Sequence, residues 1–168
     1  NGINFENNFI MRCYDFSKQR HIRIGSIGRD SPQKNRNYFV KILLELSNFK
    51  KIRSFIFGSN VKDSNDLNKY RFLNNINLNL MESNKDISKI FSKIDILIVT
   101  SLYGEGCPNV IIEAMQYGVL VFSTDVGDAK YIIGDKRFII PDEDPLGAVS
   151  KILKVNNSKN KNQYIIKF

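Results

Sequence analysis

The sequence has few of the residues on which common catalytic and metal sites depend. Its 168 residues include no tryptophan, one histidine and two cysteines. The histidine, His21, opens an expected strand, at the end opposite to where ligands bind, which excludes a Ser/His/Asp or Cys/His catalytic set. Cys13 and Cys107 form no CxxC or other metal spacing, so we expect free thiols in a reducing cytoplasm.

Long apolar runs and the common nucleotide-binding glycine motifs are also missing. No apolar run approaches the ~20 residues of a membrane-spanning helix. GSIG, residues 25–28, is not G-x-G-x-x-G, and no P-loop lysine pattern occurs, which weakens interpretations as a nicotinamide-dependent enzyme or a P-loop NTPase. The N-terminal residues do not form a secretory signal, and the chain resembles a segment from the middle of a longer protein.

What the sequence does have is a surplus of positive charge. Lysine and arginine number 25 against 17 aspartates and glutamates, a formal net charge of +8. Such a surplus attracts anions, which include nucleic acid, an anionic membrane face and phosphorylated ligands. The charge alone does not select one of these partners, and most of the lysines are expected to form a solvated surface.

Apolar strand-like runs alternate with helical patterns along the chain, which predicts an α/β domain with a doubly wound, Rossmann-like parallel sheet covered on both faces. The expected strands are 21–28, 54–60, 76–80, 95–101, 119–125 and 137–141. The expected helices are 34–49, 64–75, 86–93, one from about 107–109, a short one after 127, and 144–154. We expect a linker and domain start at 1–20, the domain at 21–155 and a polar, truncated tail at 156–168.

The segment after the first expected strand carries cations at the start of a helix. Gly28 ends the strand, and Arg29, Lys34 and Arg36 follow at or just before the helix N-terminus. Cations there oppose the helix dipole, and a bound phosphate would turn this cost into a gain. In the alternative interpretation Arg29 pairs with Asp30 and Lys34 points into water, and taken alone the segment favours that alternative.

A second segment, YGEGCPNVIIEAMQYG at 103–118, combines glycines, a proline and two glutamates. Proline is suited to the first turn of a helix, so Glu105 is expected in a loop and Glu113 on the helix. Carboxylates in these places can accept hydrogen bonds from a vicinal diol such as a ribose and from hydroxyls on another part of a ligand. Either glutamate alone favours a surface or turn role, whereas the pair with this spacing favours binding. Helix-start amides suited to an anion are those of Cys107, Asn109 and Val110.

Two further segments at the expected sheet edge give weaker evidence for a functional site. PDEDP contains Asp142 and Asp144 with the D-x-D spacing of some metal sites, but Asp144 is better explained as the N-cap before Pro145, so no metal site is expected. STDVGDAKYII, residues 123–133, is by physical reasoning only another loop at the same edge.

Taken together and in order, four of these segments resemble GT-B glycosyltransferases of family 4. IGRDSPQKN resembles the family's "GR, then K" segment, EGCPNVIIEAM its E-x7-E motif and STDVGDA the loop that follows. NGINF resembles the turn where the chain leaves the acceptor-binding domain, and the likeness extends from residue 1 to about residue 153.

The resemblance implies the C-terminal, donor-binding half of a GT-B fold. By motif position, Arg29 and Lys34 would hold the diphosphate of a nucleotide-diphosphate sugar, Glu105 the donor sugar and Glu113 the ribose hydroxyls. The first three are the expected catalytic residues. The remaining donor-binding residues would be Gly28, Gly106, Cys107, Asn109 and Val110, with Cys107 standing where the family commonly has a bulky apolar residue.

The implied activity is transfer of a sugar, such as that of a UDP-sugar, to a glycan or lipid-linked acceptor in polysaccharide biosynthesis. The family retains the anomeric configuration and needs no metal or other cofactor. We expect the full-length protein to act in the cytoplasm, where its basic surface permits docking on an anionic membrane face, and this domain alone to be inactive. Alternatives are another GT-B enzyme, such as a sugar-nucleotide epimerase, and a basic non-catalytic nucleic-acid-binding module. The last needs aromatic residues interleaved with basic ones, which the sequence does not show, so nucleic acid is not an expected partner.

Overall fold

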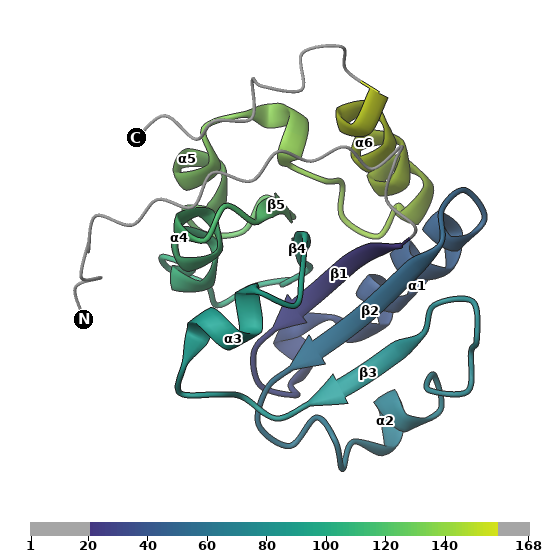
Figure 1. The fold of residues 1–168 in the computed structure, drawn as a ribbon. Coiled ribbons are helices and arrows are strands. Elements are labelled where there is room, and N and C mark those ends of the chain that lie inside the picture. Colours follow the sequence, from purple (N-terminus) through teal and green to yellow (C-terminus); the bar gives the residue numbers. More distant parts are fainter. Residues whose placement is uncertain (1–20, 158–168) are drawn as a thin grey trace.

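The computed structural model describes residues 21–157, and these form one five-stranded sheet with helices around it (Figure 1). The strands are β1 Ile22–Ile27, β2 Ile52–Phe57, β3 Leu78–Met81, β4 Ile96–Val99 and β5 Leu120–Ser123. All pairs are parallel, and the spatial order is β3-β2-β1-β4-β5. The first described strand, β1, therefore lies in the middle of the sheet, with β2 and β3 on one side of it and β4 and β5 on the other. This order confirms the predicted doubly wound arrangement.

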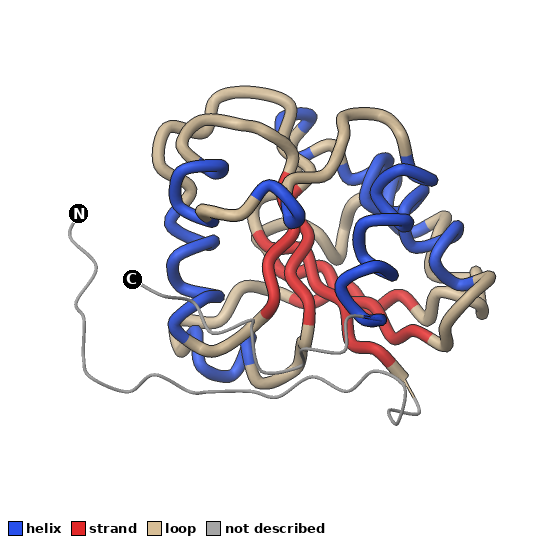
Figure 2. Tube along the Cα trace, turned by 90° about the horizontal axis from the view of Figure 1, so that it is seen from above, coloured by secondary structure: helices blue, strands red, loops and turns tan. Residues whose placement is uncertain are grey.

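Helices cover both faces of the sheet (Figure 2). Buried residues of α1 Arg36–Ser47, α2 Asn65–Asn68 and α6 Pro145–Asn157 belong to one apolar cluster. Those of α3 Ile87–Phe91, α4 Asn109–Gln116 and α5 Ala129–Ile133 belong to a second cluster. Along β4, Ile96 and Ile98 join the first cluster and Leu97 joins the second, because successive side chains of a strand point to opposite faces. A strand buried on both faces is therefore apolar throughout.

The predicted strand at 137–141 is wrong. Residues Lys136–Phe138 form a 3-10 turn instead, and Ile139 makes only an isolated bridge to Ser123. The carboxylate of Asp135 accepts hydrogen bonds from the backbone and the guanidinium of Arg137, at 2.6–3.1 Å. These local bonds stabilise a turn where the apolar residues alone indicated a strand.

The predicted helix at 64–75 is also shorter than expected. Only Asn65–Asn68 is helical, because the segment is rich in asparagine, which has low helix propensity. The expected linker at 1–20, with Cys13 and the NGINF motif, and residues 158–168 of the expected tail lie outside the described residues. Between residues 21 and 157, no helix combines the length and the apolar character needed to cross a membrane.

Candidate functional site

The order of the strands identifies one place at the carboxyl edge of the sheet where a ligand can enter. The connection from β1 leads to β2 on one side, and β4 lies on the other side of β1. Loops leaving β1 and β4 therefore diverge, and open α/β sheets bind their ligands at such a switch point. The two segments that sequence analysis singled out, 28–36 and 103–118, lie here.

The two loops meet through backbone contacts at the switch point. The amide of Leu102 donates to the carbonyl of Gln33 at 2.9 Å. The hydroxyl of Thr100, at the end of β4, donates to the carbonyl of Lys34 at 2.8 Å and to that of Asn35 at 3.2 Å. Thr100 thereby places the short 3-10 turn Pro32–Lys34 against the second loop, and this fixes where Lys34 stands.

Lys34 and Glu105 form an ion pair across this junction. The Lys34 ammonium lies 2.5 Å from Glu105 Oε1, and the two side chains are only 17% and 14% exposed. The lysine passes over Gly28, where an added Cβ would lie 2.7 Å from Lys34 Cε and where φ is +134°. Only glycine fits this conformation and this space. Gly28 and Lys34 of the first motif and Glu105 of the second therefore come together, and the alternative in which Lys34 points into water is wrong.

Buried hydroxyls hold Glu105 in this position. Ser101 Oγ donates to the same Glu105 oxygen at 2.9 Å, and Thr124 Oγ1 at the end of β5 donates to the carbonyl of Ser101 at 2.8 Å. Both hydroxyl residues are buried. Sequence analysis did not identify them as site residues, although hydroxyl residues follow both strands, Thr100 and Ser101 after β4 and Thr124 after β5, and were a usable signal.

The segment 123–129 supports the same loop from the other side. The amide of Asp128 donates to the carbonyl of Gly106 at 2.9 Å. Gly127 has φ +51°, and a Cβ there would lie 2.0 Å from the carbonyl oxygen of Glu105. Gly127 is thus required by a close backbone approach, and the segment is more than another loop at the edge.

The other two cations of the first segment have different surroundings. Arg29 is exposed and forms no ion pair with Asp30 or with any other described residue, so it can reach a ligand. Arg36 is buried, donates through Nη2 to the Gly28 carbonyl at 2.7 Å and also bonds Ser26 Oγ. Burial lowers the pKa of its guanidinium to about 10. Arg36 therefore points into the protein and holds the backbone of the loop at Gly28. Sequence analysis missed this role, because the position of a residue in the sequence does not show the direction of its side chain.

The second glutamate lies on α4, which begins at Asn109 as predicted, directly after Pro108. The first-turn amides of Asn109 and Val110 have no carbonyl partner within the helix. Glu113 is half-buried, and this desolvation raises the pKa of its carboxyl group. In the part of the chain that the structure describes, no group donates a hydrogen bond to this carboxylate. Glu113 is thus desolvated and keeps its acceptor capacity for a ligand.

The D-x-D segment has a structural role. Asp144 Oδ1 accepts a hydrogen bond from the Gly147 amide at 2.9 Å, which confirms the predicted cap of α6. The hydroxyl of Tyr38, which lies on α1, donates to the carbonyls of Pro141 and Asp144 at 2.5 and 3.1 Å. These hydrogen bonds hold the segment against α1. Over residues 21–157, no three or more His, Cys, Asp and Glu side chains gather as metal ligands would.

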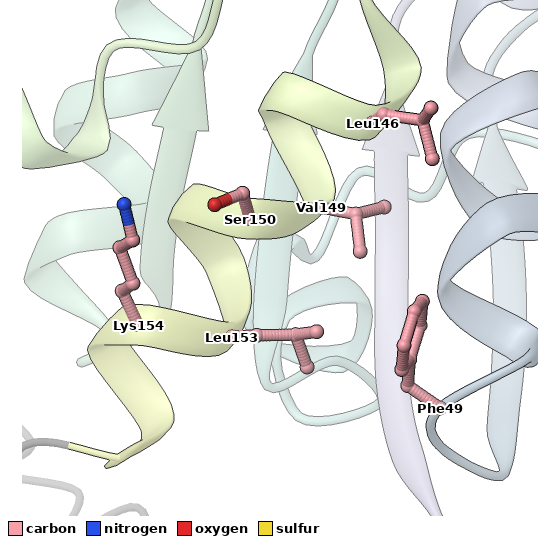
Figure 3. Close-up of a pocket in the computed structure, with 6 residues that line it drawn as sticks. All are labelled: Phe49, Leu146, Val149, Ser150, Leu153 and Lys154. Atoms are coloured by element: carbon pink, nitrogen blue, oxygen red, sulfur yellow. The ribbon is translucent and has the colours of Figure 1, made fainter.

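A shallow groove lies elsewhere, along α6 (Figure 3). It is lined by Phe49, Leu146, Val149, Ser150, Leu153 and Lys154 and measures about 290 Å³. Phe49 stands between α1 and the start of β2, so this end of the groove is at the amino edge of the sheet. The lining offers one cation and no carboxylate, which makes it a poor place for a diphosphate or a diol.

Comparisons with solved structures agree with the fold. A glycosyltransferase from Rickettsia africae superposes with a TM-score of 0.71 at 19% identity, over 85% of this chain and 40% of that chain. Alr3699/HepE from Anabaena, crystallised with UDP and glucose, gives 0.68 at 18%, over 84% and 40%. The catalytic domain of the cholesterol-α-glucosyltransferase from Helicobacter pylori gives 0.67 at 17%, over 86% and 94%.

The superpositions show a shared Rossmann-like fold, and at 17–19% identity they show the fold alone. The chain spans only 40% of the length of the Rickettsia and Anabaena proteins. No curated protein matches the chain. The model of the family described as glycosyl transferases group 1, however, matches residues 15–168, which is most of the sequence. The chain therefore belongs to the glycosyl transferases group 1 family.

Proposed function

We propose that the chain is the C-terminal, donor-binding domain of a family 4 GT-B glycosyltransferase. The full-length enzyme would transfer a sugar from a nucleotide-diphosphate sugar to a glycan or lipid-linked acceptor, with retention of configuration and without a metal or other cofactor. The observation that carries the proposal is the contact of Lys34 with Glu105 at the switch point of the sheet. It joins the basic loop and the glutamate loop into one site.

The diphosphate would lie against the loop after β1. Arg29 is exposed there, Lys34 is close by, and Gly28 has no side chain to block the approach. Amides at the start of α4, from Gly106 and Cys107 to Asn109 and Val110, would add hydrogen-bond donors at the positive end of a helix. When the sugar leaves, negative charge develops on the diphosphate, and cations fixed at this point would stabilise it.

The two glutamates would recognise hydroxyl groups at different parts of the ligand. Glu105 would accept hydrogen bonds from the donor sugar, and Glu113, which lies on α4, from the ribose. The base would lie near the end of β3, where Met81 is the last strand residue at the same edge of the sheet. Backbone groups of residues 80–83 would contact it.

A ligand screen tests the proposal. UDP-, GDP- and ADP-sugars are added to the 168-residue chain, and thermal unfolding is followed. HepE was crystallised with UDP and glucose, which supports UDP-glucose as the first ligand. We expect one nucleotide series to raise the unfolding midpoint, because a ligand that binds only the folded state stabilises it. No shift with any nucleotide sugar at millimolar concentration would contradict the proposal. Product analysis with the full-length protein then separates sugar transfer from epimerisation.

Glu113→Ala tests the assignment of the ribose. The wild-type chain is expected to bind the ribonucleotide more tightly than its 2′-deoxy analogue. The variant should lose about tenfold of this preference, because a hydrogen bond to a charged group is worth about 1.5 kcal/mol or more. Calorimetry measures both affinities, with Glu45→Ala on α1 as the control. An unchanged preference in the Glu113 variant would show that a group other than Glu113 binds the ribose hydroxyls.

A further inference from the structure

Glu105 places a negative charge inside a site that is otherwise built for an anion. Its carboxylate is bound by Lys34 at 2.5 Å and by Ser101 Oγ at 2.9 Å, and it is only 14% exposed. Of the two cations that would hold a diphosphate, Lys34 is already paired with a carboxylate, whereas the exposed Arg29 has no described carboxylate partner. A diphosphate that binds the Lys34 ammonium must therefore compete with the Glu105 carboxylate for this cation.

The carboxylate has little freedom to move away from an incoming anion. Ser101 is itself fastened by Thr124 Oγ1, which donates to its carbonyl at 2.8 Å. The backbone of Glu105 is packed against Gly127, where an added Cβ would come within 2.0 Å of the Glu105 carbonyl. We therefore expect the negative charge to stay beside Lys34 when a ligand binds.

A fixed carboxylate affects a nucleotide sugar and a free nucleotide diphosphate in opposite ways. The free diphosphate ends in a phosphate whose second pKa is near 6, so at neutral pH it carries about one negative charge more than its sugar ester. That charge is repelled by Glu105, at a strength that grows where water is excluded. The sugar ester instead presents hydroxyl groups, which donate hydrogen bonds to a carboxylate.

We propose that the Lys34–Glu105 pair sets the selectivity of the site for the nucleotide sugar over the free nucleotide diphosphate. Glu105 weakens binding of the free nucleotide diphosphate, which is the product, and strengthens binding of the nucleotide sugar, which is the donor. After each transfer, this difference favours replacement of the bound product by a new donor molecule. Lys34 holds the carboxylate that makes this distinction, and Ser101 orients it. The inference rests on the proposed function, since it concerns two ligands of that site.

Glu105→Gln tests the inference because it removes the charge and keeps the size. The dissociation constants of UDP and UDP-glucose are measured by calorimetry at pH 7.5 for the wild-type chain and the variant. If the screen identifies another base, the corresponding pair replaces them. We expect UDP to bind on the order of tenfold more tightly to the variant. UDP-glucose should bind no more tightly than to the wild type, so the preference for the sugar ester falls. UDP affinity that stays within twofold, or weakens, overturns the inference.

Asp125→Asn is the matched control. Asp125 is an exposed carboxylate two residues after the end of β5, at the same edge of the sheet, and pairs with Lys130 at 3.6 Å. Its replacement changes the net charge by the same amount, and we expect the ratio of the two dissociation constants to stay within twofold of wild type. An equal change in both variants would mean that overall charge, and not the Lys34–Glu105 pair, sets the preference, and would overturn the inference.

Ser101→Ala separates orientation from charge. It keeps both members of the ion pair and removes only the hydrogen bond that orients Glu105. We expect weaker binding of UDP-glucose with UDP affinity unchanged, whereas equal losses for both ligands would contradict the role of Ser101. Failure of the inference is distinct from failure of the proposed function. A wild-type chain that binds neither ligand refutes both, and one that binds both ligands without a change of ratio in Glu105→Gln refutes only the inference.

Discussion

Replacing Lys34 by alanine is expected to weaken binding of a nucleotide diphosphate by about 1.5–3 kcal/mol, which is about 10- to 150-fold. Two effects act in the same direction. The ligand loses a charged hydrogen-bond donor, and Glu105 loses the ammonium group that lies 2.5 Å away. The remaining carboxylate, with only Ser101 as a donor, would then repel the diphosphate. Titration calorimetry measures the change.

Arg29→Ala is expected to have a smaller effect in the same direction, toward the lower end of this range, because Arg29 is exposed and salt and water screen its charge. Lys41→Ala is the control, since this exposed lysine on α1 changes the net charge equally without lying at the sheet edge. Unchanged affinity in both the Lys34 and Arg29 variants would contradict the placement of the diphosphate.

Gly58→Ala is expected to lower the free energy of unfolding by about 1–3 kcal/mol, because it overpacks the junction of two strands. A Cβ at Gly58, directly after β2, would lie 1.9 Å from the carbonyl oxygen of Gly28, directly after β1. That carbonyl also accepts a hydrogen bond from the buried Arg36, so it cannot withdraw without disturbing a second group. Chemical denaturation of both proteins measures the difference.

The same substitution should also reduce nucleotide affinity, because moving Gly28 displaces the loop that carries Arg29 and Lys34. Gly106→Ala serves as the control for stability. Nothing lies within 4 Å of an added Cβ at Gly106, so we expect its stability to be unchanged or slightly higher. A Gly58→Ala protein as stable as wild type would mean that the ends of β1 and β2 are not in close contact.

Much of the fold can be predicted from the sequence because its central strands are buried on both faces. The run DILIVT has no polar residue between Ile96 and Val99, and a short apolar run rich in β-branched residues is typical of a parallel strand that is covered on both faces. The failure at 137–141 has the opposite cause. Its apolar residues do enter the core through Phe138, whose ring lies 5.2 Å from that of Phe122, but they do so from a turn that Asp135 stabilises.

The candidate site can be predicted in part for a similar reason. Loop residues after parallel strands must lie at one edge of the sheet, so Lys34 and Glu105 were expected on the same side. Their direct contact was not predictable, because they stand 71 positions apart and no local pattern encodes a side-chain direction. The roles of Ser101 and Gly127 likewise depend on backbone contacts between loops, which appear only when the sheet is assembled.

Hydrogen exchange with and without a saturating nucleotide-diphosphate sugar tests the central claim most directly, because it locates the ligand along the chain. The account predicts slower exchange in residues 28–36 and 104–113, at the carboxyl edge of the sheet. It predicts no change along α6, where the groove of Figure 3 runs between Leu146 and Lys154. Protection confined to α6 and Phe49, with none in the loops after β1 and β4, would contradict it.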